Sequence, residues 1–150
     1  MTQDPSHPEA GLGELLCFAI YSANLAFGRT YKPMLDELGL TYPQYFALVA
    51  LYEEDGVTVS RLGEKLFLDS NTLTPLLKRL ETAGLVDRRR DVRDERQVLV
   101  SLTPAGRAAR EKAFAFWDRL VASSGVTETE ASRLREDLVQ VRDHLLDSGG

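Results

Sequence analysis

Cysteine and histidine are nearly absent from this sequence. Its 150 residues include one cysteine, Cys17, and two histidines, His7 and His144. One cysteine excludes an intramolecular disulfide and a thiolate metal cluster within the chain. His7 lies in a flexible-looking tail and His144 near the other end, so we expect neither a metal nor a cofactor. A lone cysteine is most often an inert core residue. The residues around Cys17 therefore decide whether it has a function.

Long apolar runs are also missing. No segment approaches the roughly 18 apolar residues of a membrane span. The N-terminal sequence MTQDPSHPEAG lacks the basic and apolar regions of a signal peptide. These absences predict a cytoplasmic protein without a membrane segment. A hydrophobic content of 43% and a charged content of 27% are typical of a globular protein. The length suits a single domain over residues 1–150.

Basic residues are fewer than acidic ones, but they are unevenly placed. The formal net charge is −5. Residues 57–103 alone carry +2 and the remainder −7. The positive excess therefore coincides with one segment, which predicts weak non-specific binding to nucleic acid and a contact surface on one face.

That segment has the pattern of a helix-turn-helix. Residues 60–66 and 72–83 both show helical periodicity, and in the second of them Leu73, Leu76, Leu77 and Leu80 are spaced along one face. The opposite face is polar and carries Asn71, Thr72, Thr74, Lys78 and Arg79. Short hydrogen-bonding side chains and cations on one helix face suit the major groove of DNA.

A charged β-hairpin is predicted directly after this helix. Residues 85–90 and 96–102 have strand composition, and the acidic and basic residues 91–95 between them suit an exposed turn. Five arginines gather here: Arg88, Arg89, Arg90, Arg93 and Arg96. Arginines on a protruding hairpin suit phosphate contacts and insertion into a narrow minor groove. We therefore predict a winged helix-turn-helix over residues 57–103. The alternative interpretation is an ordinary core helix beside a solvated hairpin.

Helices are predicted on both sides of this segment. Residues 1–10 are expected to form a flexible lead. An apolar helix over 12–30 has Cys17 in its middle and Tyr21 one turn further. A short helix is expected to begin at Lys32 and Pro33 and to end at Gly39. Thr41 and Gln44 form a capping box for a helix that reaches about Glu53.

Two more helices are predicted after the hairpin. One is expected from Thr103 to about Ser123, and the other begins at a capping box formed by Thr127 and Glu130. The last helix has an apolar seam of Ala131, Leu134, Leu138, Val141 and Leu145. We infer that residues 11–56 and 104–150 supply sensor and homodimerisation helices, which would place two recognition helices about 34 Å apart. The alternative is an intramolecular helical cap.

The aromatic residues are concentrated in the first third of the chain. Eight of the twelve lie between Phe18 and Tyr52, and all five tyrosines are among them. Buried phenol groups need hydrogen-bond partners, and a thiolate is a good acceptor. Such phenols would keep Cys17 partly ionised, while apolar walls would admit a lipophilic oxidant. The alternative is that the tyrosines are core residues with peripheral hydroxyl groups.

Three strings of the sequence resemble a known family. They are LCFAIYSANLAFGRTYKPMLDELGLTYPQYFAL, LFLDSNTLTPLLKRLETAGLV and DERQVLVSLTPAGR, which together cover roughly residues 14–110. They resemble the organic hydroperoxide resistance repressors (OhrR) within the MarR family of bacterial regulators. The fold that this resemblance implies is mainly α with a small β-hairpin wing, flanked by N- and C-terminal dimerisation helices.

The resemblance also implies roles for single residues. Cys17 would be the peroxide-sensing thiolate, with Tyr31 and Tyr42 of the other subunit as hydrogen-bond donors and Tyr21 as a secondary contact. Asp94 would orient Arg96 for the minor groove. Ser70, Thr72, Thr74, Lys78 and Arg79 would face the major groove. Arg88, Arg90, Arg93 and Asn71 complete the candidate DNA-binding set.

The chain departs from the family pattern at two places. Asn71 stands where the motif more often has glycine, which affects the start of the recognition helix. Some members have a second cysteine that resolves the oxidised sensor, whereas Ser124 and Val126 occupy that region here. The chain therefore resembles the one-cysteine type.

These observations lead to one main hypothesis. A homodimeric repressor would bind a pseudo-palindromic operator when reduced and release it when an organic hydroperoxide oxidises Cys17, after which a low-molecular-weight thiol caps the sulfur. The alternative is a MarR-type repressor released by a reversible lipophilic or phenolic ligand. A thiol peroxidase is disfavoured because no thioredoxin-type pattern is present, so we expect no enzyme.

Overall fold

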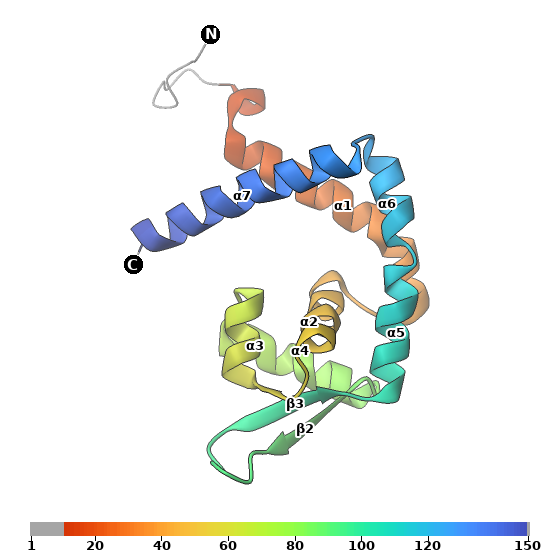
Figure 1. Cartoon of the computed structure of the whole chain (residues 1–150), viewed down its shortest axis with the longest axis vertical. Coiled ribbons are helices and arrows are strands. Elements are labelled where there is room, and N and C mark those ends of the chain that lie inside the picture. The colour runs from red at the N-terminus through yellow and green to blue at the C-terminus, as the bar shows by residue number, and fades with distance from the viewer. Residues whose placement is uncertain (1–10, 150) are drawn as a thin grey trace. The chain divides into compact units, whose positions relative to one another are not determined.

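The structure is a computed structural model that describes residues 11–149 (Figure 1). The described residues are mainly helical, with one small antiparallel sheet. The predicted fold class is therefore confirmed. Of the described residues, 11–111 form one compact unit and 112–149 another. His7 and the predicted flexible lead over residues 1–10 lie outside the described part of the chain.

The first long helix is continuous through a proline. After the short turn η1 (Leu12–Glu14), α1 runs over Leu16–Leu38 and ends at Gly39, whose φ is 69°. The predicted break before Pro33 is wrong. A proline removes one backbone hydrogen bond, and burial of the side chains on both sides of it, Tyr31 and Met34, offsets that loss.

The start of α1 also corrects the expected place of the cysteine. Cys17 is the second residue of α1, not a residue in the middle of a helix. The chain before it forms the η1 turn instead of extending the helix, and Leu15 between the two has extended backbone angles. Cys17 therefore lies in the first helical turn.

Helix α2 (Tyr42–Glu53) begins with the predicted capping box. The Gln44 backbone N–H donates to Thr41 Oγ1 at 3.4 Å, and the Thr41 N–H donates to Gln44 Oε1 at 2.9 Å. Pro43 fits the first turn, where backbone N–H groups have no partner within the helix. Half of the residues of α2 are buried, including Tyr45, Leu48 and Leu51. This helix is the centre of the first unit.

The helix-turn-helix is present as predicted. It consists of α3 (Val59–Leu66) and α4 (Ser70–Thr82), which are capped by Thr58 and Asp69 respectively. Pro75 lies in the second turn of α4. The carbonyl that loses its partner belongs to exposed Asn71, so water can bind it. All four leucines of the predicted apolar face are buried.

The hairpin is confirmed and gains a third strand. β2 (Val86–Arg90) pairs antiparallel with β3 (Val98–Leu102), and Val86 lies opposite Leu102. β1 (Val57–Thr58) pairs with the other edge of β3, giving the order β1-β3-β2. Two residues carry no periodicity, so β1 was not predicted. Figure 1 shows β2 and β3 extending away from α2, α3 and α4.

The predicted helix over 104–123 is wrong, because it is two helices. α5 (Pro104–Phe114) and α6 (Trp117–Ser124) are separated at Ala115 and Phe116. The Phe116 N–H donates to the Ala113 carbonyl at 3.2 Å, a three-residue step that interrupts the α-helical ladder. Neither residue is a proline or a glycine, so the sequence carries no signal for this break.

The last helix, α7, covers Glu128–Ser148. Its predicted cap is present, since the Glu130 N–H donates to Thr127 Oγ1 at 3.1 Å. All three leucines of the predicted apolar seam, Leu134, Leu138 and Leu145, are exposed in the single chain. No helix among residues 11–149 is long and apolar enough to cross a membrane.

Candidate DNA-binding surface and sensor site

One face of α4 is built from the residues that the sequence placed there. The capping bond from the Thr72 N–H to Asp69 Oδ1, at 2.8 Å, fixes the start of the helix. The buried leucines hold the opposite face against the core. The exposed face then presents Ser70, Asn71, Thr72, Thr74, Lys78 and Arg79. Hydroxyl, amide and cationic groups thus share a surface that suits base edges and phosphates.

The tip of the hairpin holds an arginine in a fixed orientation. Arg96 Nε donates to Asp94 Oδ1 at 3.1 Å, and Nη2 donates to Oδ2 at 3.4 Å. Hydrogen bonds from the Arg96 side chain and backbone hold the pKa of Asp94 below its usual value. The Arg96 side chain is still 90% exposed. The pair therefore presents a guanidinium to solvent in a set direction.

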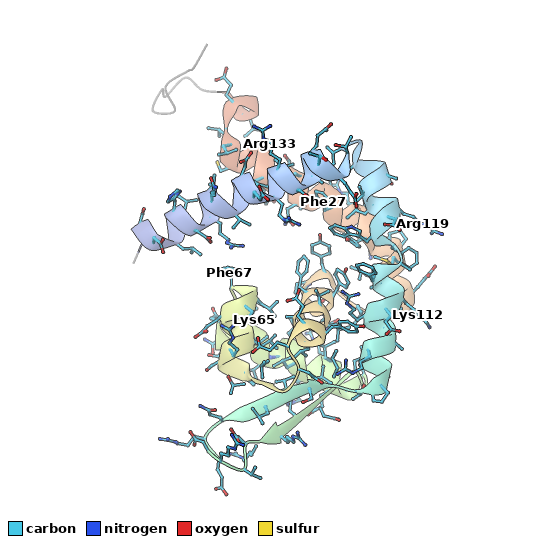
Figure 2. All side chains as sticks on the ribbon, in the orientation of Figure 1. Phe27, Lys65, Phe67, Lys112, Arg119 and Arg133 are labelled. Carbon is cyan, nitrogen blue, oxygen red and sulfur yellow. The ribbon has the colours of Figure 1, made fainter. Side chains whose placement is uncertain are left out.

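Two further arginines lie in the same turn. Arg90 Nη1 donates to the Glu95 carbonyl at 2.8 Å, which ties the end of β2 to the turn. The Arg93 backbone N–H donates to Asp91 Oδ1 at 2.9 Å, and the Arg93 residue is exposed. Figure 2 shows nitrogen atoms gathered around this tip. The tip thus presents arginine side chains on a backbone that hydrogen bonds hold in place.

Arg88 is placed differently from the other arginines. Its Nη2 lies 3.2 Å from Glu81 Oε1 and its Nε lies 3.4 Å from Glu81 Oε2, so it connects β2 to α4. The hydrogen bond from Arg88 is the largest cause that lowers the pKa of Glu81. Glu81 could not be identified from the sequence, because nothing in the spacing of the two residues indicates that the turn after α4 brings them together.

Cys17 lies among exposed apolar side chains. It is itself exposed, and its neighbours Leu16 and Ile20 are exposed by 59% and 40%. Tyr21 is one turn further along α1, and its ring centroid is 6.4 Å from that of Phe18. The sulfur is therefore accessible in the single chain, on an apolar face.

Tyr31 lies too far from Cys17 of the same chain to contact it. Both residues belong to α1 and are separated by fourteen positions. At about 1.5 Å per residue, this corresponds to roughly 21 Å along the helix axis. The structure of one chain therefore does not bring the predicted sensor residues together.

Three tyrosines, Tyr31, Tyr42 and Tyr45, form a contact group that we call the tyrosine cluster. The ring centroid of Tyr31 is 5.3 Å from that of Tyr42 and 5.6 Å from that of Tyr45. The Tyr31 side chain is buried, with 4% of its surface exposed. The family resemblance identified Tyr31 and Tyr42 but not Tyr45. The position of Tyr45, one turn after Tyr42, could have indicated that it lies beside Tyr42.

Burial governs the ionisation of the tyrosine cluster. It is the largest cause that raises the pKa of each phenol above its ordinary value. For Tyr31, the charges of Tyr45 and Tyr42 and a hydrogen bond with Tyr45 raise the pKa further. For Tyr45, the charge of Arg110 and the hydrogen bond with Tyr31 act in the opposite direction. All three phenols are therefore neutral donors at neutral pH.

The described residues contain no group of three or more histidine, cysteine or acidic side chains that could hold a metal ion. Cys17 supplies a nucleophilic sulfur, and the tyrosine cluster supplies O–H donors.

Comparison with known proteins gives the family. A family model described as transcriptional regulator SarA/Rot matches residues 29–112. The regulator TtmR of Methylorubrum extorquens is 46% identical over 145 residues, which cover 97% of this chain and 74% of TtmR. The organic hydroperoxide resistance transcriptional regulator of Bacillus subtilis is 52% identical over 98 residues, which cover 65% of this chain and 67% of that protein.

A solved structure agrees with these relatives. The structure of reduced AbfR bound to DNA matches with a TM-score of 0.74 and 38% identity, over 90% of this chain and 94% of AbfR. AbfR comes from Staphylococcus epidermidis. All of these proteins are described as regulators or bound to DNA, and none as an enzyme. The chain therefore belongs to the MarR family of DNA-binding transcriptional regulators, in the branch of the organic hydroperoxide resistance regulators, with a single cysteine.

Proposed function

We propose that this regulator is a homodimeric redox-sensing repressor. In its reduced form it binds a pseudo-palindromic operator, and oxidation of Cys17 by an organic hydroperoxide releases it. The observation that carries the proposal is the place of the only cysteine, which is exposed on an apolar face in the first turn of α1. The name of the Bacillus subtilis relative supports the class of oxidant.

The proposed chemistry begins at the sulfur of Cys17. The thiolate attacks the terminal oxygen of the hydroperoxide, the O–O bond breaks, and the alcohol leaves as an alkoxide that takes up a proton. Cys17 becomes a sulfenic acid, oxidised by two electrons. A low-molecular-weight thiol then condenses with the sulfenic acid, which releases water and forms a mixed disulfide. Further peroxide can instead overoxidise the sulfur.

The apolar surroundings of Cys17 explain a preference for organic hydroperoxides. Leu16 and Ile20 offer apolar surface to an alkyl or aryl group, from which hydrogen peroxide gains nothing. Tyr21, on the same face, would complete this surface as a secondary contact. The selectivity is thus proposed to come from burial of the organic part of the oxidant.

The tyrosine cluster is proposed to bind the sulfur across the dimer. Tyr31 and Tyr42 have neutral O–H groups that can donate to a thiolate, which is a charged acceptor. Because Tyr31 is roughly 21 Å from Cys17 along its own helix, the donors have to come from the second subunit. Oxidation changes the size and charge of the sulfur, so these hydrogen bonds would break.

DNA recognition is proposed for α4 and for the hairpin. The exposed face of α4 would enter the major groove. Arg93 and the pair of Asp94 and Arg96 would lie at the minor groove. Two α4 helices about 34 Å apart would contact successive major grooves of the operator. A change of about 3 kcal/mol in the dimer on oxidation would lower operator affinity over a hundredfold.

Cys17→Ser tests this function. Operator binding by wild type and by the variant is titrated with cumene hydroperoxide and, separately, with hydrogen peroxide. We expect a low concentration of the organic peroxide to release wild type, a higher concentration of hydrogen peroxide to be needed, and the variant to stay bound. The reason is that serine offers no sulfur to oxidise.

Two results contradict the proposal. If both proteins stay bound, or if both are released alike, Cys17 is a packing residue. A phenolic or lipophilic compound that releases both proteins without oxidation would favour reversible ligand binding instead.

A further inference from the structure

Two arginines of α5 lie over one aromatic ring at the end of α2. Arg110 Cζ is 4.4 Å from the centroid of the Tyr52 ring, and Arg107 Cζ is 5.9 Å from it. Both distances allow attraction between a guanidinium and the face of the ring. The ring of Tyr52 therefore links two cations of the helix that follows the winged helix.

Arg107 is connected to the sheet through one carboxylate. Its Nη2 donates to Asp55 Oδ2 at 2.8 Å, while Asp55 Oδ1 accepts a hydrogen bond from the Leu102 N–H at 2.9 Å. Leu102 is the last residue of β3, the central strand. A displacement of Arg107 would therefore change the hydrogen bond between Asp55 and β3, which is one of the two strands of the hairpin.

Arg110 is connected to the tyrosine cluster. Tyr45 and Tyr52 are seven residues apart on α2, which places them two turns apart on one face. The charge of Arg110 reaches Tyr45, since it lowers the pKa of that phenol against the larger effect of burial. Tyr45 in turn contacts Tyr31. Ring contacts, the charge of Arg110 near Tyr45 and hydrogen bonds therefore connect the cluster to β3.

We propose that Arg110 is a positioning residue that couples the tyrosine cluster to strand β3 of the winged helix, through Tyr52, Arg107 and Asp55. This inference rests on the proposed redox function of Cys17. When Tyr31 and Tyr42 lose the sulfur as an acceptor, their rings shift against Tyr45, and Arg110 follows. Arg107 shares the Tyr52 ring with Arg110, so the hydrogen bond between Asp55 and Leu102 changes with it.

Arg110→Met tests the coupling, because methionine keeps much of the length of the side chain and removes its charge. Arg119→Met is the matched control, since Arg119 lies over the Phe116 ring at 5.2 Å and is not part of this series of contacts (Figure 2). Operator affinity is measured for each protein when reduced and after complete oxidation of Cys17, which mass spectrometry verifies.

We expect oxidation to lower the affinity of wild type and of Arg119→Met about a hundredfold. For Arg110→Met the loss is expected to be about tenfold or less, with the affinity of the reduced protein little changed. Arg110→Lys, which restores a cation over Tyr52, is expected to recover part of the response. A purely structural role of Arg110 would weaken both redox states alike and leave their ratio unchanged. An equal loss in wild type and Arg110→Met therefore overturns the proposal.

A second measurement needs no DNA and holds even if Arg110→Met binds the operator poorly. Hydrogen exchange of the Leu102 amide is expected to become faster on oxidation of wild type and to stay unchanged in Arg110→Met. Equal acceleration in both proteins overturns the coupling. If wild type itself keeps full operator affinity after complete oxidation, the proposed redox function fails, and the coupling fails with it.

Discussion

The phenols of the tyrosine cluster make the stability of the folded chain sensitive to alkali. Their pKa values are raised by burial, whereas in the unfolded chain they return to about 10. The folded state therefore keeps protons that the unfolded state releases. The free energy of unfolding is unaffected by these groups below about pH 10 and falls as the pH rises beyond it, by up to about 1.4 kcal/mol per pH unit for each phenol.

Tyr31→Phe is expected to make this alkaline fall shallower, because it removes the most strongly affected phenol. Urea unfolding between about pH 9 and pH 11 measures the slope for wild type and variant. Between pH 7 and pH 9 the two proteins should show the same pH dependence, which is the internal control. An identical fall in both proteins above pH 10 would show that Tyr31 ionises freely in the folded state.

At the scale of single residues, the sequence indicated which chemical groups are present but not which of them meet. The tyrosines near Cys17 in sequence indicated phenol donors, yet Tyr31 and Cys17 lie fourteen positions apart on one helix. Tyr45 follows Tyr42 by one helical turn, which could have indicated that the two lie on one face, but residue types alone do not say that the Tyr31 and Tyr45 rings meet. The contact of Arg88 with Glu81 was missed for the same reason, since it depends on the turn after α4.

At the scale of elements, the arginines of the hairpin differ in whether they contact α4. Arg88 is held by Glu81 with a 25% exposed side chain, whereas Arg93 is an exposed residue at the tip of the hairpin. An arginine that neutralises a DNA phosphate contributes about 0.9 to the slope of log affinity against log salt concentration. The salt dependence of binding therefore distinguishes an arginine that contacts a phosphate from one that only connects β2 to α4.

Arg93→Gln is expected to reduce this slope by about 0.9 for each phosphate that is no longer neutralised, and Arg88→Gln is expected to leave it nearly unchanged. Arg88→Gln should still weaken binding by a factor of a few, because the hairpin is less firmly held to α4. Operator titrations at several salt concentrations measure both quantities. A slope change for Arg88→Gln as large as that for Arg93→Gln would make Arg88 a phosphate contact.

Helix α5 approaches the turn after α4 so closely that only glycine fits at one position. A Cβ atom at Gly106 would lie 2.1 Å from the Leu85 carbonyl oxygen and 3.1 Å from Leu102 Cδ2. The carbonyl belongs to the backbone and also accepts a hydrogen bond from the Thr103 N–H, so it cannot move aside at little cost. Gly106 therefore fixes how α5 leaves the sheet.

Gly106→Ala is expected to lower the free energy of unfolding by about 1–3 kcal/mol despite the better helix propensity of alanine. Gly28→Ala in α1 is the matched control, because nothing lies within 4 Å of its Cβ position. There the substitution should stabilise the chain by up to about 1 kcal/mol. Urea unfolding measures the free energy of unfolding of both variants. A neutral or stabilising effect of Gly106→Ala would contradict the close approach.

Elements with strong local signals were predictable, and those set by context were not. The capping box of Thr41 and Gln44 and the apolar face of α4 follow from spacing alone. Pro33 was expected to start a helix, but α1 continues past it because the residues on both sides of it are buried. The break at Phe116 and the two-residue strand β1 depend on packing and pairing, which leave no mark in local composition.

At the scale of the whole molecule, the single chain exposes apolar surface and does not complete the proposed sensor site. In the first unit, exposed apolar residues of α1 include Leu16, Ile20, Leu25 and Phe27. In the second unit, α7 exposes Leu134, Leu138, Leu145 and Leu146. Surface of this kind on two helices is typical of an interface. We propose that a second copy of the chain covers it and brings Tyr31 and Tyr42 to Cys17.

A heterodimer of two defective subunits tests this arrangement. One subunit carries Cys17→Ser, and the other carries Tyr31→Phe with Tyr42→Phe. If donors and sulfur come from different subunits, the one remaining Cys17 faces intact tyrosines across the interface. Its reaction with an organic hydroperoxide should then proceed at the wild-type rate per cysteine. Differently tagged subunits allow the heterodimer to be purified, and mass spectrometry follows the oxidation.

The homodimer of the tyrosine double variant is the matched control, because its Cys17 faces phenylalanine in either arrangement. It should react about tenfold more slowly or worse, since a hydrogen bond to a charged group contributes about 1.5–3 kcal/mol. A heterodimer as slow as this control would mean that the second subunit supplies no donor. Because α1 separates Tyr31 from Cys17 by roughly 21 Å within one chain, that result would remove Tyr31 from the sensor altogether.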